Sequence, residues 1–275
     1  MPRLLGHLRA NTNLWKHIVK LRKTRLWPKY SVVKSIDGVF FECDFELDPT
    51  GIRMYLGLYE PWTVAVMKRF LAKGDAFIDV GANIGYLSAV GASLVGPAGC
   101  VHGFEPVPSY FRQLRRLADM NPGYTIIPHR VAAGDTEGRF TIHTSKTSSG
   151  ANTIVPGLKI DEDIDDRVEI PVVRLDSYIE AAGSTRIALI KIDTEGFEYP
   201  VLRGLMGYLE GTHNRPTIIA EVEPAAYPLL GCTLADLSAY MDRYGYRAYR
   251  LDAIGRREID VTALESTTNL VFVAD

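Results

Sequence analysis

The feature that most constrains the fold is a regular alternation of short apolar segments with longer amphipathic ones. Four aliphatic runs read as buried strands: 76–80, 100–105, 187–192 and 217–222. Segments with helical spacing of apolar residues accompany them: 61–71, 84–95, 109–120, 176–181, 234–244 and one that follows the third run and ends at residue 209. Strands that alternate with helices predict an α/β fold whose mostly parallel sheet is covered by helices on both faces.

Further strands are expected at 125–132, 139–143 and 168–173. The last two strands, 246–251 and 269–273, have no helical segment between them. Parallel neighbours need a long crossover connection, so these two strands should pair antiparallel and give the sheet an antiparallel edge.

The charge of the chain is unevenly distributed. The formal net charge of 275 residues is only -2, but residues 1–30 contain eight Lys or Arg and no acidic residue. No apolar run approaches the ~18–20 residues of a transmembrane helix. The three cysteines are far apart in the sequence, which favours a reducing, cytoplasmic setting. We therefore divide the chain into a basic helical and hairpin extension, 1–57, and one α/β domain, 58–275.

The sequence leaves three interpretations of the role of the basic extension open. It is compatible with packing on a partner subunit, such as a second copy in a homo-oligomer, or with peripheral contact of residues 1–30 with an anionic membrane surface. Contact with nucleic acid is the least favoured reading and is not expected, because the remaining 245 residues carry 23 basic against 33 acidic side chains and repel a polyanion.

A glycine turn follows the first buried strand, in the segment Asp79-Val-Gly-Ala-Asn-Ile-Gly85. Gly81 permits a tight turn and close approach of a ligand, and Gly85 permits close packing at the start of the next helix. The segment lacks the Gly-Lys-Ser/Thr ending of a phosphate loop, and Asn83 replaces the middle glycine of the dinucleotide fingerprint. A ligand with adenosine but no phosphate, S-adenosylmethionine, fits this turn better.

Acidic residues accompany the glycine turn in the expected places. Glu105 ends the next strand, 24 residues after Gly81, where a carboxylate accepts hydrogen bonds from ribose hydroxyls. Asp79 is suited to hold the ammonium group of the cofactor, directly or through water. These residues predict a nucleoside site at the carboxyl ends of the strands.

Several segments together resemble the FkbM-type methyltransferases. They are the glycine turn, Phe104-Glu-Pro106, Tyr59-Glu-Pro61, Ala133-Gly-Asp135, Arg174-Leu-Asp-Ser177 and, most specifically, Lys191-Ile-Asp-Thr-Glu-Gly-Phe-Glu198. The resemblance covers roughly residues 55–275. It implies a class I, Rossmann-like methyltransferase fold with a seven-stranded sheet whose last strand is antiparallel, S-adenosylmethionine as donor and a hydroxyl of a sugar or natural product as acceptor. It adds Glu60, Ala133 and Asp135 to the expected cofactor-binding residues Asp79, Gly81, Asn83, Gly85 and Glu105.

The acids that end the next strands are the candidate catalytic groups. Asp193 and Glu195 follow the strand 187–192, and Glu221 lies in the strand 217–222. We expect all three to converge beside the reactive methyl group. They suit either a carboxylate base, with a pKa raised by acidic neighbours, or a Mg²⁺ site held by Asp193 and Glu221. Acids also favour the first turn of a helix regardless of function, which is the simpler reading of Glu195.

Segment 144–153 is rich in Ser and Thr and is expected to form a loop. The sequence leaves open whether it is a plain surface loop or closes over a polar acceptor, with Asn152 as a hydrogen-bonding group. The sequence thus predicts an S-adenosylmethionine-dependent O-methyltransferase that acts on a small-molecule or glycan acceptor. Two alternatives stay open: N-methylation, which the absence of an Asn/Asp-Pro-Pro-Tyr/Phe motif disfavours, and a non-catalytic cofactor-binding partner subunit.

Overall fold

The computed structural model describes residues 30–45, 50–145, 152–158, 164–182, 186–211, 215–253 and 257–274. The predicted helical part of the basic extension, with its proposed membrane contact, lies outside these residues. Among the described helices, none has the length and apolar character needed to cross a membrane.

The central sheet has seven strands in the order β11-β12-β10-β9-β3-β4-β5. In that order they are Tyr246–Arg250, Thr268–Ala274, Thr217–Val222, Ile187–Ile192, Ala76–Val80, Cys100–Phe104 and Thr125–His129. Neighbours from β10 to β5 pair parallel, whereas β12 is antiparallel to both β10 and β11. The predicted antiparallel last strand is confirmed, although β12 lies between β10 and β11 instead of at the sheet edge. This is the class I methyltransferase arrangement that the sequence predicted.

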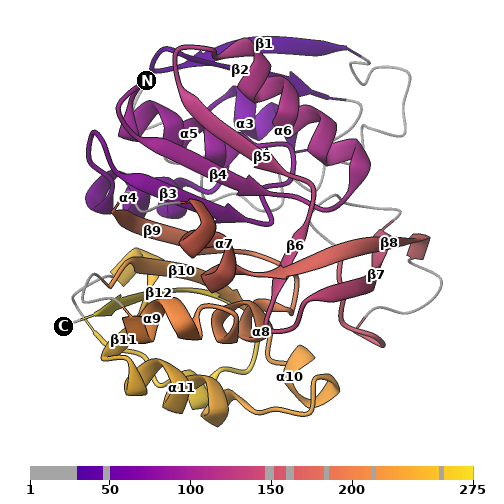
Figure 1. The fold of residues 1–275 in the computed structure, drawn as a ribbon, viewed down its shortest axis with the longest axis vertical. Helices are drawn as coiled ribbons and strands as arrows, with labels where there is room; N and C mark the ends of the chain where they lie inside the picture. The colour runs from indigo at the N-terminus through magenta and orange to yellow at the C-terminus, as the bar shows by residue number, and fades with distance from the viewer. Residues whose placement is uncertain are drawn as a thin grey trace.

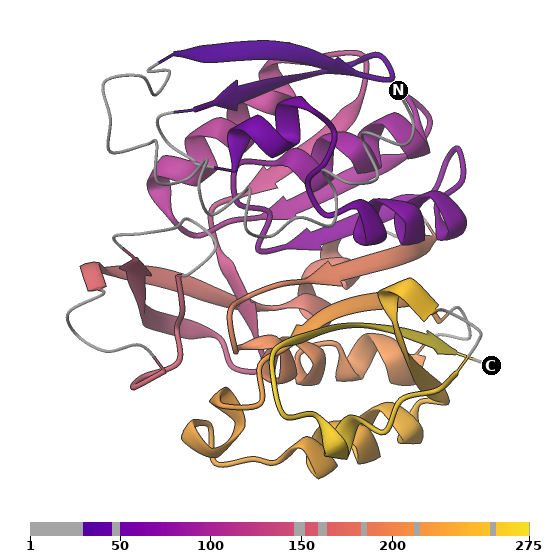
Figure 2. The same ribbon diagram turned by 180° about the vertical axis from the view of Figure 1, so that it is seen from behind.

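Helices cover both faces of this sheet (Figures 1 and 2). One face packs against α4 (Pro61–Phe70), α5 (Tyr86–Val95) and α6 (Pro108–Met120). The other packs against α7 (Leu175–Ala182), α8 (Glu198–Arg203), α9 (Met206–Gly211) and α11 (Leu234–Arg243). Strand residues alternate between the two cores: Phe77 faces the first, and Ile78 faces the second. The strands are therefore buried on both faces, as their continuous apolar runs require.

A second, three-stranded sheet stands beside the main one, with the order β6-β8-β7. Its strands are Ala132–Gly134, Ile164–Arg174 and Gly138–Ser145. Figures 1 and 2 show it projecting beyond the main sheet on the side where β3 and β4 end. The strand predicted over 125–132 is confirmed as β5, but its predicted end was wrong, because the chain leaves the main sheet after His129 and Ala132 begins β6. The strands predicted at 139–143 and 168–173 are confirmed.

The predicted helix that ends at 209 is divided into α8 and α9 at Gly204 and Leu205. A side chain at Gly204 would meet the carbonyl oxygen of Gly134 at 2.0 Å, so β6 presses against the chain at this point. Four further short elements lie among the described residues: α3 (Gly51–Tyr55), α10 (Ala226–Leu229) and 3-10 turns at Leu251–Ala253 and Val261–Ala263.

An N-terminal hairpin joins β1 (Ser31–Ile36) to β2 (Val39–Asp44) in antiparallel register. Phe41 and Cys43 of β2 are buried in the same core as α5 and α6. Asn121, at the end of α6, donates to and accepts from the backbone of Phe40. The hairpin and the sheet thus share one hydrophobic core.

Candidate functional site

A cleft that opens to solvent lies at the carboxyl ends of β3, β4 and β9. The predicted residues that line it are Glu60, Gly81, Asn83, Glu105, Ala133, Asp193 and Glu195. Apolar and aromatic side chains that were not among the predicted site residues also line it: Met54, Tyr59, Tyr86, Phe104, Val107, Ile142 and Ile154.

The glycine turn forms the floor of the cleft. Gly81 has φ 75°, and a side chain there would meet the carbonyl oxygen of Asp193 at 1.8 Å. Asn83 also adopts positive φ, 52°, which asparagine tolerates better than most residues. Gly85, with φ 89°, caps α5, and a side chain there would lie 3.0 Å from the side chain of Leu114. Two of the five residues of the turn are thus glycines with positive φ, and Asn83 between them lines the cleft.

Glu105 closes one end of the cleft and holds the turn in place. It is buried, and its carboxylate accepts hydrogen bonds from the backbone N–H groups of Asn83 at 2.9 Å and Val107 at 2.8 Å. Burial raises the pKa of Glu105 to about 7, against the stabilising effect of these two donors. Each carboxylate oxygen keeps a lone pair for a further donor.

Lys191 is a buried lysine that was not among the predicted site residues. Its Nζ atom lies 3.1 Å from Asp193 and 3.6 Å from Asp79, and it donates to the carbonyl oxygen of Gly81 at 3.1 Å. Burial lowers the pKa of Lys191, but the nearby Asp193 and Asp79 more than offset this and raise it above its usual value. Its signal in the sequence is a lysine within the apolar strand 187–192.

Asp79 lies behind the cleft and does not line it. Its carboxylate is fully buried and accepts a hydrogen bond from Ser88 at 2.6 Å. Burial raises the pKa of Asp79, while the ammonium of Lys191 lowers it. Asp79 therefore faces Lys191, and its predicted contact with the cofactor's ammonium stays a prediction.

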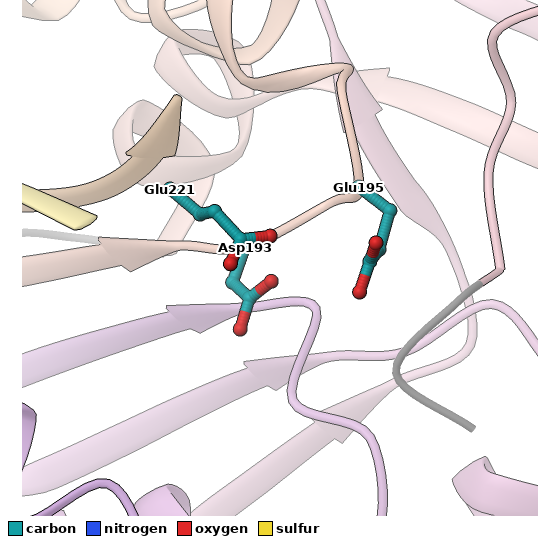
Figure 3. A group of neighbouring side chains, drawn as sticks. All are labelled: Asp193, Glu195 and Glu221. Atoms are coloured by element: carbon teal, nitrogen blue, oxygen red, sulfur yellow. The ribbon is translucent and has the colours of Figure 1, made fainter. Parts of the chain in front are cut away.

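The carboxylates of Asp193, Glu195 and Glu221 lie near one another, as Figure 3 shows, and the first two residues line the cleft whereas Glu221 does not. Asp193 follows β9, Glu195 lies in the next turn and Glu221 projects from β10. One carboxylate oxygen from each lies within 4.8 Å of the others. Burial, followed by repulsion from Asp193 and Glu195, raises the pKa of Glu221 to about 9. Their predicted convergence is what the structure shows, while their roles in catalysis stay predictions.

Glu198 is not one of these three carboxylates, but it holds the turn that carries Glu195. It is fully buried and accepts hydrogen bonds from the backbone N–H of Thr194 at 2.8 Å and of Gly196 at 3.0 Å. Burial raises its pKa to about 7. These bonds fix the turn in which Glu195 adopts φ 54°, an uncommon conformation for a residue with a side chain.

Of two further predicted cofactor-binding residues, Glu60 lines the cleft and Asp135 does not. Glu60 lines the cleft at the start of α4, and burial followed by the charge of Asp193 raises its pKa. Asp135 does not line the cleft: its carboxylate pairs with Arg203, and its backbone carbonyl accepts a hydrogen bond from Arg174 at 2.7 Å. In this structure Asp135 ties the end of β6 to α8.

Asn152, from the segment predicted to cover the acceptor, also lines the cleft. Its side-chain oxygen accepts a hydrogen bond from the backbone N–H of Ser145 at 2.8 Å. Residues 146–151 of that segment lie outside the described residues. Asn152 and Ile154 thus form the wall of the cleft on the side of the small sheet.

Comparison with known proteins points to one family. The family model of the methyltransferase FkbM domain matches residues 79–248. The chain is 32% identical over 167 residues to 31-O-demethyl-FK506 methyltransferase FkbM of Streptomyces tacrolimicus, covering 49% of this chain and 61% of that protein. It is 26% identical over 154 residues to hexuronic acid methyltransferase AglP of Haloferax volcanii, covering 56% of this chain and 58% of that protein.

The chain thus spans about three fifths of the length of these curated relatives. Among solved structures, it is similar to methyltransferase FkbM from Methylobacillus flagellatus KT, with a TM-score of 0.44 and 18% identity. That match covers 82% of this chain and 54% of the other.

Proposed function

The chain belongs to the FkbM methyltransferase domain family, and we propose that it transfers the methyl group of S-adenosylmethionine to a hydroxyl group of a sugar or natural-product acceptor. The observation that carries this proposal is a cleft lined by carboxylates and built on a glycine turn that lacks a phosphate-binding motif. Four carboxylates line it, those of Glu60, Glu105, Asp193 and Glu195. Among the described lining residues, Lys191 is the one lysine or arginine. Such a site favours a cationic nucleoside and disfavours a pyrophosphate.

The residues present fit S-adenosylmethionine. Glu105 offers carboxylate lone pairs to ribose hydroxyls, and Phe104 and Val107 offer apolar surface beside it. Gly81 lets the turn after β3 pack directly against the turn after β9, since a side chain there would meet the carbonyl oxygen of Asp193 at 1.8 Å. When bound, this cofactor supplies a methyl group on a positively charged sulfur, which is already activated for transfer.

Glu105 makes the binding of the donor dependent on pH. Because its pKa is about 7 and ribose hydroxyls donate to its ionised form, binding favours loss of its proton. Affinity therefore rises with pH through about 7. We expect Glu105→Gln to bind the donor about tenfold more weakly at pH 8 and to lose the step near pH 7. Calorimetric titrations of both proteins at matched pH values test this, because the ratio of the two affinities cancels the titration of the ligand's own amino group.

The remaining chemical task is to orient the acceptor hydroxyl and to take its proton. We assign the second role to Glu221, because its carboxylate lies within 4.8 Å of those of Asp193 and Glu195 and because its ionised form, which becomes populated as the pH approaches its raised pKa of about 9, is a stronger base than an ordinary carboxylate. Asp193, which Lys191 contacts at 3.1 Å, is suited to accept a hydrogen bond from the hydroxyl and to orient it. The names of the two curated relatives, a hexuronic acid and an FK506 methyltransferase, support an acceptor that is a sugar or a natural product.

The same carboxylates are a candidate Mg²⁺ site, since Asp193, Glu195 and Glu221 offer three oxygens within 4.8 Å of one another. Lys191 already supplies a cation at 3.1 Å from Asp193. We therefore expect transfer to continue after treatment with EDTA and extensive dialysis. Loss of activity with EDTA and its recovery with added Mg²⁺ would assign the three carboxylates to a metal instead.

The assay for the proposed function uses the full chain, S-adenosylmethionine with a radiolabelled methyl group, and a panel of neutral glycosides, uronic acids and polyhydroxylated natural products. Mass spectrometry of the labelled product identifies the methylated atom. Label on oxygen supports the proposal, and label on nitrogen supports the N-methyltransferase alternative. Donor binding without transfer to any acceptor supports a cofactor-binding partner subunit.

A further inference from the structure

A buried threonine, Thr153, joins the small sheet to the turn after β9. Its side chain and backbone are shielded from solvent. Its backbone N–H donates to the carbonyl oxygen of His143 in β7 at 3.0 Å, and its own carbonyl oxygen accepts from the N–H of His143 at 2.8 Å. Its hydroxyl donates to the carbonyl oxygen of Glu195 at 2.6 Å. Thr153 therefore bonds to the small sheet through its backbone and to the turn after β9 through its side chain.

The hydroxyl of Thr153 makes two hydrogen bonds at once. It donates to Glu195, and it accepts from the backbone N–H of Val155 at 3.1 Å. Apolar packing accompanies these bonds, because a side chain at Gly196 would lie 2.8 Å from Leu158 and 3.5 Å from Val155. The segment that contains Thr153 thus packs directly on the turn that carries Glu195.

Residues on both sides of this contact line the cleft. Asn152 and Ile154 flank Thr153 and line it, and so does Glu195. In the sheet order β9-β3-β4, the turn with Glu195 follows β9, whereas Glu105, the proposed ribose partner, follows β4. The contact therefore lies away from the proposed ribose site, with β3 between them, in the part of the cleft where the proposed function places the acceptor.

The turn with Glu195 needs support from its surroundings, because φ 54° is uncommon for a residue with a side chain. Glu198 bonds the N–H groups of this turn, at Thr194 and Gly196. Thr153 bonds its carbonyl side, at Glu195. Without the hydroxyl of Thr153, this carbonyl loses a donor, and the turn can shift relative to the small sheet.

We propose that Thr153 is a positioning residue for the acceptor: its hydroxyl fixes Asn152 relative to Glu195, so that both side chains meet the acceptor in one arrangement. The proposal rests on the proposed function and adds a residue that governs the fit of the acceptor. These hydrogen bonds of Thr153 involve neither the glycine turn nor Glu105. Loss of the hydroxyl therefore affects use of the acceptor and leaves the binding of the donor intact.

Two substitutions at Thr153 separate its hydroxyl from its methyl group in the full chain. Thr153→Val removes the hydroxyl and keeps nearly the same shape, whereas Thr153→Ser keeps the hydroxyl. The assay measures initial rates at saturating S-adenosylmethionine, with the acceptor of the panel that wild-type protein methylates fastest, and calorimetry measures donor affinity. We expect Thr153→Val to lower kcat/KM for the acceptor by roughly tenfold to a hundredfold, with donor affinity within about twofold of wild type. Thr153→Ser should keep most of the wild-type kcat/KM.

Hydrogen exchange, read by mass spectrometry, tests the contact without an acceptor. Peptides that contain residues 152–158 and 193–198 should exchange faster in Thr153→Val than in wild type, and Thr153→Ser should exchange like wild type. Thr141→Val is the matched control, because Thr141 is exposed on β7, and it should match wild type in every measurement. If Thr153→Val binds no donor, Thr153→Cys takes its place, because a thiol is only a weak donor.

A wild-type kcat/KM in Thr153→Val overturns the proposal. So does an equal loss in Thr153→Ser, which would assign the effect to the methyl group. A loss of donor affinity as large as the loss of kcat/KM also overturns it, since the hydroxyl would then support the cleft as a whole. If wild-type protein methylates no acceptor of the panel, the proposed function fails and the positioning role with it, and this outcome is recognised in the wild type alone.

Discussion

Replacing Glu221 with glutamine will reduce methyl transfer by about 10²–10⁴-fold, measured at a donor concentration that saturates the variant. The amide has nearly the shape of the carboxylate but does not accept the proton of the acceptor hydroxyl. A hydroxyl hardly ionises below pH 9, so the reaction depends on such a base, and the two proteins are compared near pH 9, where Glu221 with its pKa of about 9 is ionised in a substantial fraction. The readout is kcat, because a weaker affinity for the donor changes only the concentration needed for saturation.

Glu223→Gln provides the matched control, two residues further along the chain. Glu223 accepts a hydrogen bond from the backbone N–H of Ala225 at 3.1 Å and pairs with Thr267, and it does not line the cleft. We expect it to retain wild-type kcat. If Glu221→Gln also turns over at the wild-type rate, Glu221 is not the base, and Asp193 becomes the candidate.

Replacing Gly81 with alanine will abolish detectable donor binding and lower the stability of the fold. The new methyl group would lie 1.8 Å from the carbonyl oxygen of Asp193, so β3 and the turn after β9 must separate. A steric clash with backbone costs about 1–3 kcal/mol, and φ 75° adds about 1–2 kcal/mol for a residue with a side chain. The melting temperature should fall by roughly 4–20 °C, as measured by thermal unfolding.

Gly74→Ala separates the two causes. Gly74 has φ 89°, but a side chain there meets no atom within 4 Å. It should therefore show only the backbone cost of about 1–2 kcal/mol and should bind the donor normally. If Gly81→Ala binds the donor as tightly as Gly74→Ala does, the close approach of the turn to Asp193 has no part in the site.

The strands of the main sheet were predictable because their signals are local. A run such as Ile187–Ile192 is continuously apolar since both of its faces are buried. Two features depend on contacts distant in sequence and were missed. The chain turns out of the main sheet after His129 to form β6, and the helix after β9 breaks at Gly204, where the backbone of β6 comes too close for a side chain.

The same distinction applies to the site: some of its features were predictable from local sequence signals, and others depend on contacts between distant residues. The sequence placed Gly81, Glu105 and Asp193 in one region, because the carboxyl ends of parallel strands meet at one edge of a sheet. It did not reveal that Lys191 reaches Asp79 across from β9 to β3, since that pairing depends on strand order. Nor did it indicate that Asp135 pairs with Arg203 instead of lining the cleft.

Calorimetric titration of the full chain with S-adenosylmethionine, with NAD as the comparison ligand, tests the central claim most directly. Because the cleft is lined by carboxylates and its glycine turn lacks a phosphate-binding motif, we expect S-adenosylmethionine to bind at one site per chain and NAD not to bind. We expect Glu105→Gln to weaken the binding of S-adenosylmethionine about tenfold at pH 8. Absence of S-adenosylmethionine binding, or equal binding of NAD, would contradict the assignment of this cleft to a methyl donor.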